Sequence, residues 1–355
     1  MANIIMEDVK GGGGSGLEDA IIDRSLSEIT NNTVSAIGSY AFYSYSTLTA
    51  ISFPAASTIG NNAFAYCYSL TTADFHAVTD IGAYAFASCY SLTSVSFPVV
   101  TNIGSSAFVS CSNLTAISFS VVTNIGSNAF YNCSRLNTVD FPSATDIGGG
   151  AFNGCSRLTT VSFPALININ QTTFANCYGL TSVSFPAATN ISNNAFMYCS
   201  GLTSVSFPAV MSIGSNAFAS CYKLTTVDFP VAISISSNAF SGCSSLTTVN
   251  FPAVTYIGGS AFYGCFSLTA VSFPAASIIG SLAFTRCYRL ISLYLMSSSF
   301  VSLAAANVFS STPISNYTTY TSGVYGSIYV PASMLASYKT RANWSVYSNR
   351  FVGVE

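Results

Sequence analysis

The order of apolar and polar residues repeats along most of the chain with a period of 22 residues. In the stretch SNAFASCYKLTTVDFP, residues 215–230, the apolar positions are spaced by three, three, three and two residues: Phe218, Cys221, Leu224, Val227 and Phe229. Neither an amphipathic helix nor an alternating strand produces this spacing by itself. Because the same columns recur in each repeat, the pattern predicts a stack of similar coils.

Each repeat is expected to contain one short strand and one turn region. Leu224, Val227 and Phe229 would point inward from the strand, while Thr226 and Asp228 would point outward. A proline usually ends the strand, a turn ending in Ile-Gly follows, and S-N-A-F then predicts a single helical or 3₁₀ turn that the cysteine closes.

The 22-residue period and the L-x-x-V-x-F spacing are those of a leucine-rich repeat. We therefore predict an α/β repeat solenoid of about 13 coils, with a parallel β-sheet on one face, short helical turns on the other, and a cap at both ends. Stacking would bury the inward side chains of each coil against the same columns of its neighbours.

Three regions follow from the extent of the repeats. Residues 26–295 carry the solenoid. Residues 1–25 hold the Gly-rich stretch GGGGSG and five of the twelve acidic residues, which predicts an N-terminal arm with a flexible linker. Residues 296–355 break the period and predict a C-terminal cap, in which SIYVP forms a last strand and 332–342 a short helix.

The cysteines occupy a single column of the repeat. We expect a buried, reduced ladder in which each thiol fills a tight corner of its coil. Disulfides between neighbouring coils are compatible with the Cα spacing, but stacked side chains point in parallel and eleven is an odd number. A metal site is not expected, because the chain has no C-x-x-C pair and one histidine. The ladder comprises Cys67, Cys89, Cys111, Cys133, Cys155, Cys177, Cys199, Cys221, Cys243, Cys265 and Cys287.

The composition argues against nucleic acids and membranes as partners. Half of the residues are hydrophobic, 6% are charged, and ten Lys and Arg face twelve Asp and Glu, for a net charge of −2. A nucleic-acid-binding protein needs a basic face, which this composition does not supply. The chain has no apolar run of about twenty residues, so no membrane insertion is expected. The apolar residues near its start are too few to predict a secretory signal, which leaves open whether an upstream signal was removed.

Candidate chemistry is sparse. His76 lies in the proline column with Asp74 two residues before it, so a Ser-His-Asp site is conceivable, although a surface substitution at a turn is the simpler interpretation. GGGGSG lacks the Lys of a phosphate-binding loop. We therefore expect no catalytic residue and no cofactor. Four cations share the column two positions after Cys, either for solubility or as a polyanion site: Arg135, Arg157, Lys223 and Arg289.

The repeat A-F-x-x-C-x-x-L-x-x-V-x-F-P with a preceding I-G resembles the BspA-type (Treponema pallidum-type) leucine-rich repeats of bacterial surface proteins, over residues 26–295. The tail, 326–351, is similar to a C-terminal segment common in that family, in I-Y-V-P-A-S, Tyr338 and Asn343-Trp344. The resemblance implies a curved solenoid and a binding or adhesion role rather than an enzyme. It names no ligand.

The column directly after Cys alternates between Ser and aromatic residues, and it should lie on an exposed bend before the strand. Tyr among Ser, Asn and Gly is typical of recognition surfaces. The alternative is that the rings only shield the flank of the core. The candidate ligand-binding residues are Tyr66, Tyr68, Tyr90, Tyr178, Tyr222 and Tyr288, of which the first three fall on adjacent coils.

Two classes of function remain. The first is a non-enzymatic recognition or adhesion module that binds a protein or glycan on a cell surface, with an extracellular or cell-surface location. The second is a structural or receptor-binding component of a phage virion built on the same solenoid. In either case residues 1–25 are a candidate contact with a homo-oligomeric or virion partner.

Overall fold

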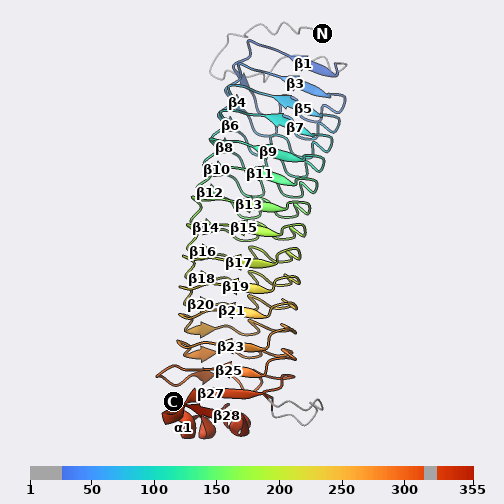
Figure 1. Cartoon of the computed structure of the whole chain (residues 1–355). Helices are drawn as coiled ribbons and strands as arrows, with labels where there is room; N and C mark the ends of the chain where they lie inside the picture. Colours follow the sequence, from blue (N-terminus) through green and yellow to red (C-terminus); the bar gives the residue numbers. More distant parts are fainter. Residues whose placement is uncertain (1–25, 316–325) are drawn as a thin grey trace. The chain divides into compact units, whose positions relative to one another are not determined.

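The computed structural model describes residues 26–315 and 326–355, and these form two compact units. The first unit comprises the chain up to Leu166 together with Thr172–Phe185, and the second comprises Ile167–Gln171 and Pro186–Glu355. In each unit the chain winds into coils whose strands pair in parallel with those of the next coil (Figure 1). The predicted arm at residues 1–25 lies outside the described residues.

The expected strand of each repeat is a three-residue strand. Its central residue is buried or half-buried and its outer residues face solvent. In the first unit these strands are β1 (Glu28–Thr30), β3 (Ala50–Ser52), β5 (Thr72–Asp74), β7 (Ser94–Ser96), β9 (Ala116–Ser118), β11 (Thr138–Asp140), β13 (Thr160–Ser162) and β15 (Ser182–Ser184). In the second unit they are β17 (Ser204–Ser206), β19 (Thr226–Asp228), β21 (Thr248–Asn250), β23 (Ala270–Ser272) and β25 (Ser292–Tyr294).

Each coil also contains a second strand, where the sequence predicted only a turn ending in Ile-Gly. It has two residues, the second of which is a buried Ile or Leu, so it is too short to show a period of two. In the first unit the strands are β2 (Ala36–Ile37), β4 (Thr58–Ile59), β6 (Asp80–Ile81), β8 (Asn102–Ile103), β10 (Asn124–Ile125) and β12 (Asp146–Ile147). In the second unit they are β14 (Asn168–Ile169), β16 (Asn190–Ile191), β18 (Ser212–Ile213), β20 (Ser234–Ile235), β22 (Tyr256–Ile257), β24 (Ile278–Ile279) and β26 (Ser302–Leu303).

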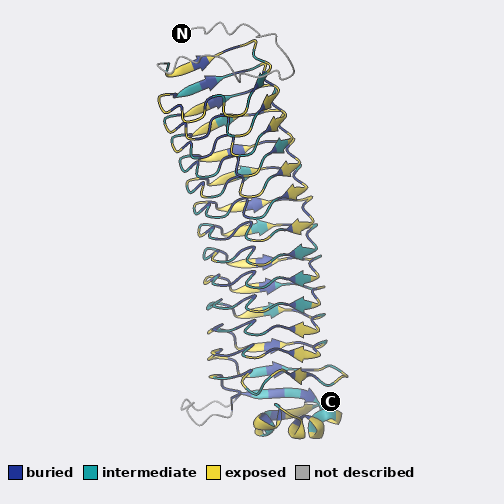
Figure 2. Ribbon diagram, turned by 180° about the vertical axis from the view of Figure 1, so that it is seen from behind, coloured by how far each residue is buried: buried dark blue, intermediate teal, exposed yellow. Residues whose placement is uncertain are grey.

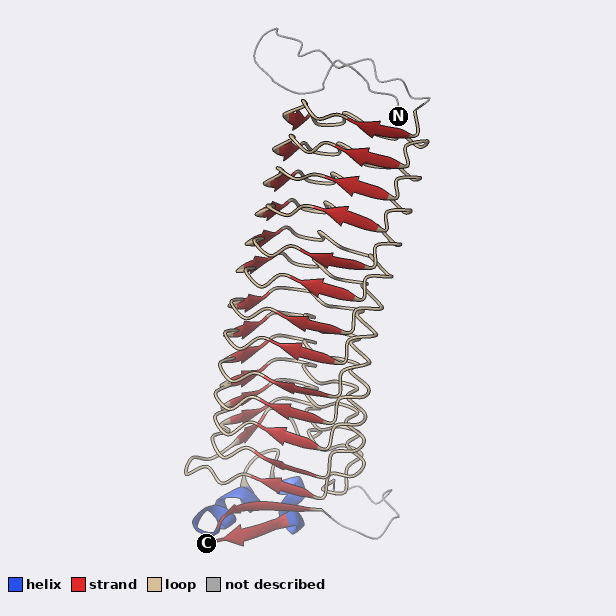
Figure 3. Cartoon of the chain, turned by 45° about the horizontal axis from the view of Figure 1, so that its top comes forward, coloured by secondary structure: helices blue, strands red, loops and turns tan. Residues whose placement is uncertain are grey.

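The helical or 3₁₀ turn predicted for each repeat is wrong. In the coil at residues 60–67, the N–H groups of Ala63, Ala65 and Cys67 each donate to the carbonyl three residues earlier, at 3.3, 3.2 and 3.2 Å. Three successive β-turns therefore take the place of a helix, and among the described residues helical segments occur only in the C-terminal cap (Figure 3).

Backbone hydrogen bonds between coils explain why β-turns form here instead of a helix. Asn62 and Tyr66 have φ values of 57° and 62°, as the third residue of a type II turn requires, and a left-handed φ interrupts a helix. The N–H groups that alternate with those of the β-turns then point towards the next coil. The N–H groups of Asn62, Phe64 and Tyr66 donate to carbonyls of the next coil, those of Ala83, Ala85 and Ala87.

Apolar columns stack on their own copies to form the core of each unit. Buried positions accordingly recur from coil to coil along the ribbon (Figure 2). In the first unit the rings from Phe42 to Phe174 lie in parallel, with centroids of successive coils 4.9–5.5 Å apart. In the second unit the rings from Phe196 to Phe309 do the same at 5.2–5.6 Å. This spacing is close to the distance between paired strands, so the sheet geometry sets the ring stacking.

Hydroxyl side chains cover backbone carbonyls on the outside of the coils. The Thr that follows the core Leu donates its Oγ1 to the carbonyl 22 residues earlier, as Thr71 does to Thr49 at 2.8 Å. A second ladder precedes the two-residue strands, where Thr101 donates to Thr79 at 3.2 Å and Thr255 to Ile233 at 3.1 Å. These bonds give Ser and Thr a structural role in both columns.

The C-terminal cap covers the last coil with the strand β27 (Ser327–Pro331), η1 (Ala332–Met334), α1 (Leu335–Thr340), η2 (Ser345–Arg350) and β28 (Phe351–Val354). The predicted last strand and short helix are present. Stacking also continues beyond Leu295, since β26 pairs with β24 and Phe309 stacks on Phe284 at 5.6 Å. Within the described ranges no helix is long and apolar enough to cross a membrane.

Candidate recognition surface

The tyrosines that the sequence singled out lie on the bend between the turns and the three-residue strand. Their side chains are 36–52% exposed. The bend is held by local backbone bonds: the Tyr68 N–H donates to Tyr66 at 2.9 Å, and the Leu70 N–H donates to Cys67 at 3.1 Å. The rings therefore project into solvent from a hydrogen-bonded backbone.

The structure brings three of these tyrosines into ring contact. Tyr68 and Tyr90 stack with centroids 5.5 Å apart and planes 6° from parallel, and Tyr66 meets Tyr68 edge-on at 6.1 Å. Two further rings, which the sequence reasoning missed, extend the contact: Tyr43 meets Tyr66 at 5.4 Å, and Tyr40 meets Tyr43 at 5.5 Å. We refer to Tyr40, Tyr43, Tyr66, Tyr68 and Tyr90 as the tyrosine cluster.

The other candidates do not join this cluster. The Tyr178 hydroxyl donates to Asn176 Oδ1 at 3.2 Å. In the second unit Tyr288 stacks on Phe266 at 5.3 Å, a partner that belongs to the same column. Tyr222 is exposed and has no ring contact among the described residues. The six candidates therefore separate into one cluster, one pair and two single rings.

The rings of the cluster are not required to shield the core. In the coils where Ser112 and Ser134 occupy the same column, the neighbouring Cys111 and Cys133 are still 0% exposed. The cysteines beside the tyrosines are no more buried, since Cys67 is also 0% exposed. A serine at this position is thus sufficient to keep the core buried. Shielding of the core therefore does not explain why tyrosine is present here.

Two rings of the cluster are attached to backbone that favours small residues. Tyr40 and Tyr66 have φ values of 61° and 62°. Elsewhere these two columns hold mostly Asn, Ser or Gly, which adopt a left-handed φ more readily than a bulky side chain does. Comparing each repeat with the typical column residue would have revealed Tyr40 and Tyr43 from the sequence.

The turn segments that bear the cluster carry no charged side chain. The three turn segments that bear it, residues 38–48, 60–70 and 82–92, contain no Asp, Glu, Lys, Arg or His. The cations Arg135, Arg157, Lys223 and Arg289 are exposed on other coils. The cluster is therefore a neutral aromatic surface flanked by hydroxyl and amide side chains.

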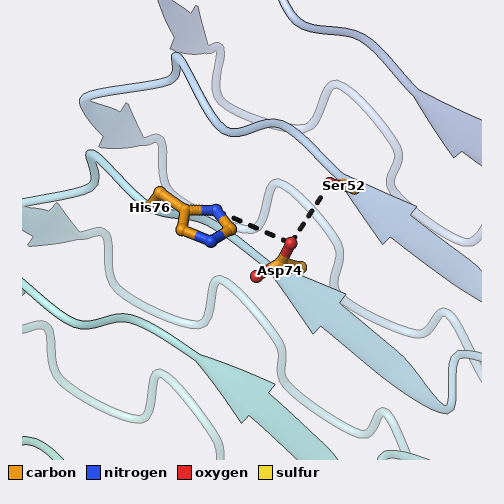
Figure 4. Close-up of polar contacts among 3 residues, drawn as sticks. All are labelled: Ser52, Asp74 and His76. Carbon is orange, nitrogen blue, oxygen red and sulfur yellow. Dashed lines mark hydrogen bonds and ion pairs between the residues drawn. The ribbon is translucent and has the colours of Figure 1, made fainter.

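The only histidine, His76, is not arranged as the middle member of a Ser-His-Asp triad. His76 Nδ1 lies 3.6 Å from Asp74 Oδ2, and Ser52 Oγ donates to the same carboxylate oxygen at 3.3 Å (Figure 4). The carboxylate lies between the other two groups, whereas in a Ser-His-Asp triad the imidazole occupies the middle and takes the proton of the serine. The Ser52 hydroxyl thus donates to Asp74 and not to His76, and the His76 and Asp74 side chains are 60% and 41% exposed.

All eleven cysteines are buried, and none of them forms a disulfide. In ten of them the thiol lies 3.1–3.3 Å from the carbonyl of the Phe 25 residues earlier, to which it donates. Burial raises the pKa of the Cys133 and Cys243 thiols from 9.0 to about 12. The described residues contain no group of three or more His, Cys, Asp or Glu side chains able to hold a metal ion.

The second unit exposes a row of apolar side chains at two adjacent columns, one just before the two-residue strands and one at the first residue of these strands. In the first unit the same positions hold Ser, Thr, Ala, Asn and Asp. Met211 and Ile233 are bonded neighbours, since the Ile233 N–H donates to Met211 at 2.9 Å. This apolar row is a second feature that the sequence reasoning missed, and it consists of Ile167, Met211, Ile233, Tyr256 and Ile278.

Comparison with known proteins agrees with this architecture. The family model described as BspA type Leucine rich repeat region (6 copies) matches residues 22–137, 123–234 and 211–325. A sequence search of curated proteins gives no match. The chain therefore belongs to the BspA-type leucine-rich-repeat family, which confirms the resemblance and the leucine-rich-repeat solenoid predicted from the sequence.

Solved structures of bacterial proteins are similar to this chain, and the first of those described next has the same fold. A leucine-rich repeat protein from Bacteroides ovatus is similar with a TM-score of 0.63 and 23% identity, over 94% of this chain and 85% of that chain. A leucine-rich cell surface protein from Faecalibacterium prausnitzii is 25% identical, with a TM-score of 0.46 over 78% and 88% of the two chains. The T. pallidum leucine-rich repeat protein is 25% identical, with a TM-score of 0.39 over 56% and 82%.

Proposed function

We propose that the protein is a non-enzymatic recognition module that binds a ligand through the tyrosine cluster, in an extracellular or cell-surface setting. One observation carries the proposal: five exposed rings are in continuous contact, and in the column of Tyr68 and Tyr90 the core stays buried with serine. Family membership supports a binding role, since leucine-rich repeat proteins commonly bind other molecules. A receptor-binding component of a virion would use the same surface.

The cluster has the physical properties of an energetically important contact. Tyr supplies a large rigid surface with an apolar face and a polar tip, and it loses little conformational entropy when it binds. Its backbone is already ordered: the N–H of Tyr40 donates to Asn61 at 3.0 Å and that of Tyr66 to Ala87 at 2.8 Å. Preorganisation of this kind lowers the cost of binding.

The test compares ligand binding by the wild type and by the double variant Tyr68→Ser/Tyr90→Ser. The probes are an immobilised glycan array and a panel of extracellular proteins. Serine already occupies this column at Ser112 and Ser134, so the fold should be retained. We expect binding to weaken by roughly 30-fold or more, because loss of about 2 kcal/mol is typical for a hot-spot aromatic residue.

Tyr222→Ser is the matched control. It makes the same substitution in the same column, at a single exposed ring. The control should bind like the wild type. If the double variant keeps full affinity for every ligand that the wild type binds, the binding site lies elsewhere and the proposal is wrong.

A further inference from the structure

We infer that the ligand of the tyrosine cluster is an uncharged oligosaccharide. This inference rests on the proposed function and specifies the chemical class of its ligand. Four properties of the surface carry it: its charge, its polar groups, its size and its repetition.

The first property is charge. Residues 38–48, 60–70 and 82–92 contain no charged side chain, and the exposed cations of the same flank lie on other coils. Within these three segments an acidic polysaccharide would find no counter-charge. Most protein partners use complementary charges for encounter and orientation, which this surface also lacks. A neutral ligand needs neither.

The second property is the kind of polar group that surrounds the rings. Ser39, Ser44 and Ser46 are exposed in the same turn segment as Tyr40 and Tyr43. A hydroxyl both donates and accepts hydrogen bonds, which suits the hydroxyl groups of a sugar. The apolar C–H face of a pyranose ring packs against an aromatic ring. Aromatic rings bordered by hydroxyl side chains therefore match both the C–H face and the hydroxyl groups of a sugar.

The third property is size. A stable interface with a folded protein covers about 800 Å² on each partner, which five side chains do not provide. Such an interface would have to extend onto the outward face of the three-residue strands, where small Ser and Thr side chains alternate with Asp74. An oligosaccharide of a few residues needs only the cluster itself.

The fourth property is repetition. Tyr68 and Tyr90 occupy equivalent positions on successive coils, with parallel rings 5.5 Å apart. A polymer of identical sugar units can present the same groups to each coil in turn. The surface therefore favours a repeating, uncharged chain over a compact ligand.

Affinity electrophoresis of the full chain tests the inference. The protein is run in native gels that contain an uncharged β-glucan, mannan or xylan, or acidic alginate or heparin. We expect at least one uncharged polymer to retard the wild type and the Tyr222→Ser control, and the retardation of Tyr68→Ser/Tyr90→Ser to be at least tenfold weaker. Because no charges are involved, binding measured in solution should change less than twofold between about 50 and about 500 mM salt.

The other outcomes separate the two proposals. Retardation by acidic polymers alone, with strong salt dependence, overturns the assignment of an uncharged ligand. If no uncharged polymer binds but a protein of the panel binds and loses affinity in the double variant, the inference fails while the proposed function stands. If an uncharged polymer retards wild type and double variant equally, both proposals fail. Circular dichroism of each variant establishes that it is folded.

Discussion

At the scale of single residues, the cysteine column does more than fill space. The Cys111 thiol donates to the Phe86 carbonyl at 3.1 Å, and the same oxygen accepts the backbone N–H of Cys89 at 3.2 Å. One carbonyl with two lone pairs thus joins two successive coils. A small side chain with a weak donor suits this corner, and the first coil replaces it with the buried ring of Tyr45.

The buried thiols predict an alkaline limit to stability. Burial raises the pKa of Cys133, Cys243 and Cys287 from 9.0 to about 12. The stability that these groups contribute is therefore fully present below pH 9.0, and it is lost as the pH rises towards 12, because the unfolded chain releases protons first. Each thiol lowers the unfolding free energy by about 1.4 kcal/mol per pH unit in this window. We expect the melting temperature to fall steeply above pH 9 in a thermal scan.

A labelling experiment isolates the thiols from other groups that ionise at high pH. A thiol reagent at pH 8 should modify few cysteines in the native protein and all eleven after denaturation. Cys177→Ala removes one buried thiol and should make the fall with pH slightly shallower. Rapid modification of most thiols in the native state would contradict their burial.

At the scale of the strand, the two-residue elements are held largely by what flanks them. Thr residues that precede them donate a hydroxyl to the coil before, as Thr255 does to Ile233. Met211 and Ile233 cannot form this bond, and they expose an apolar side chain instead, each being 52% exposed. The strand pairing is the same in both cases, so the side chain at this position is not dictated by the fold.

Ile233→Thr should consequently be tolerated. The introduced hydroxyl would lie within reach of the Met211 carbonyl, and we expect the unfolding free energy to change by less than about 0.5 kcal/mol. Retention on a hydrophobic-interaction column should fall. The control Ile235→Thr, two residues further on and 0% exposed, should cost about 2–4 kcal/mol, because it removes apolar volume and buries a hydroxyl. Equal costs for the two variants in urea unfolding would refute this distinction.

At the scale of the whole molecule, a repeat array has ends where apolar side chains lack a next coil. The cap meets this need at the C-terminus with four buried aromatic residues, Tyr338, Trp344, Tyr347 and Phe351. It also holds the backbone of the last coil: Trp344 Nε1 donates to the Val301 carbonyl at 2.7 Å, and the Val301 N–H donates to the Tyr338 hydroxyl at 3.1 Å. Burial raises the pKa of that hydroxyl.

The cap therefore predicts a graded response at Trp344. Trp344→Phe keeps an aromatic ring but leaves the buried Val301 carbonyl without the indole donor, and we expect a loss of about 1–3 kcal/mol. Trp344→Ala also opens a cavity and should cost about 3–5 kcal/mol. Both values would be measured by urea unfolding followed by circular dichroism. A Phe variant as unstable as the Ala variant would show that the bond to Val301 is the main contribution.

The sequence alone predicts those structural features whose contacts follow the 22-residue period. Stacking places each residue beside the residue one repeat away, so buried columns such as Phe86, Cys89 and Leu92 are visible as periodic apolar positions. The solenoid and the strand that carries Val227 could be predicted for this reason, whereas the last strand at 327–331 is predicted from a segment where the period breaks. The family could be recognised from the same columns.

The 22-residue period does not reveal the backbone conformation of the residues between the buried columns. The left-handed φ of Asn62 and Tyr66 turns a predicted helix into three β-turns, and it depends on hydrogen bonds to the next coil. The tyrosine cluster joins five residues from four columns, and only the tertiary structure shows that Tyr43 reaches Tyr66. The sequence by itself determined which residues are buried, because burial repeats with the coil. The tertiary structure decided which exposed residues meet, because those contacts depend on local turn geometry that differs from column to column.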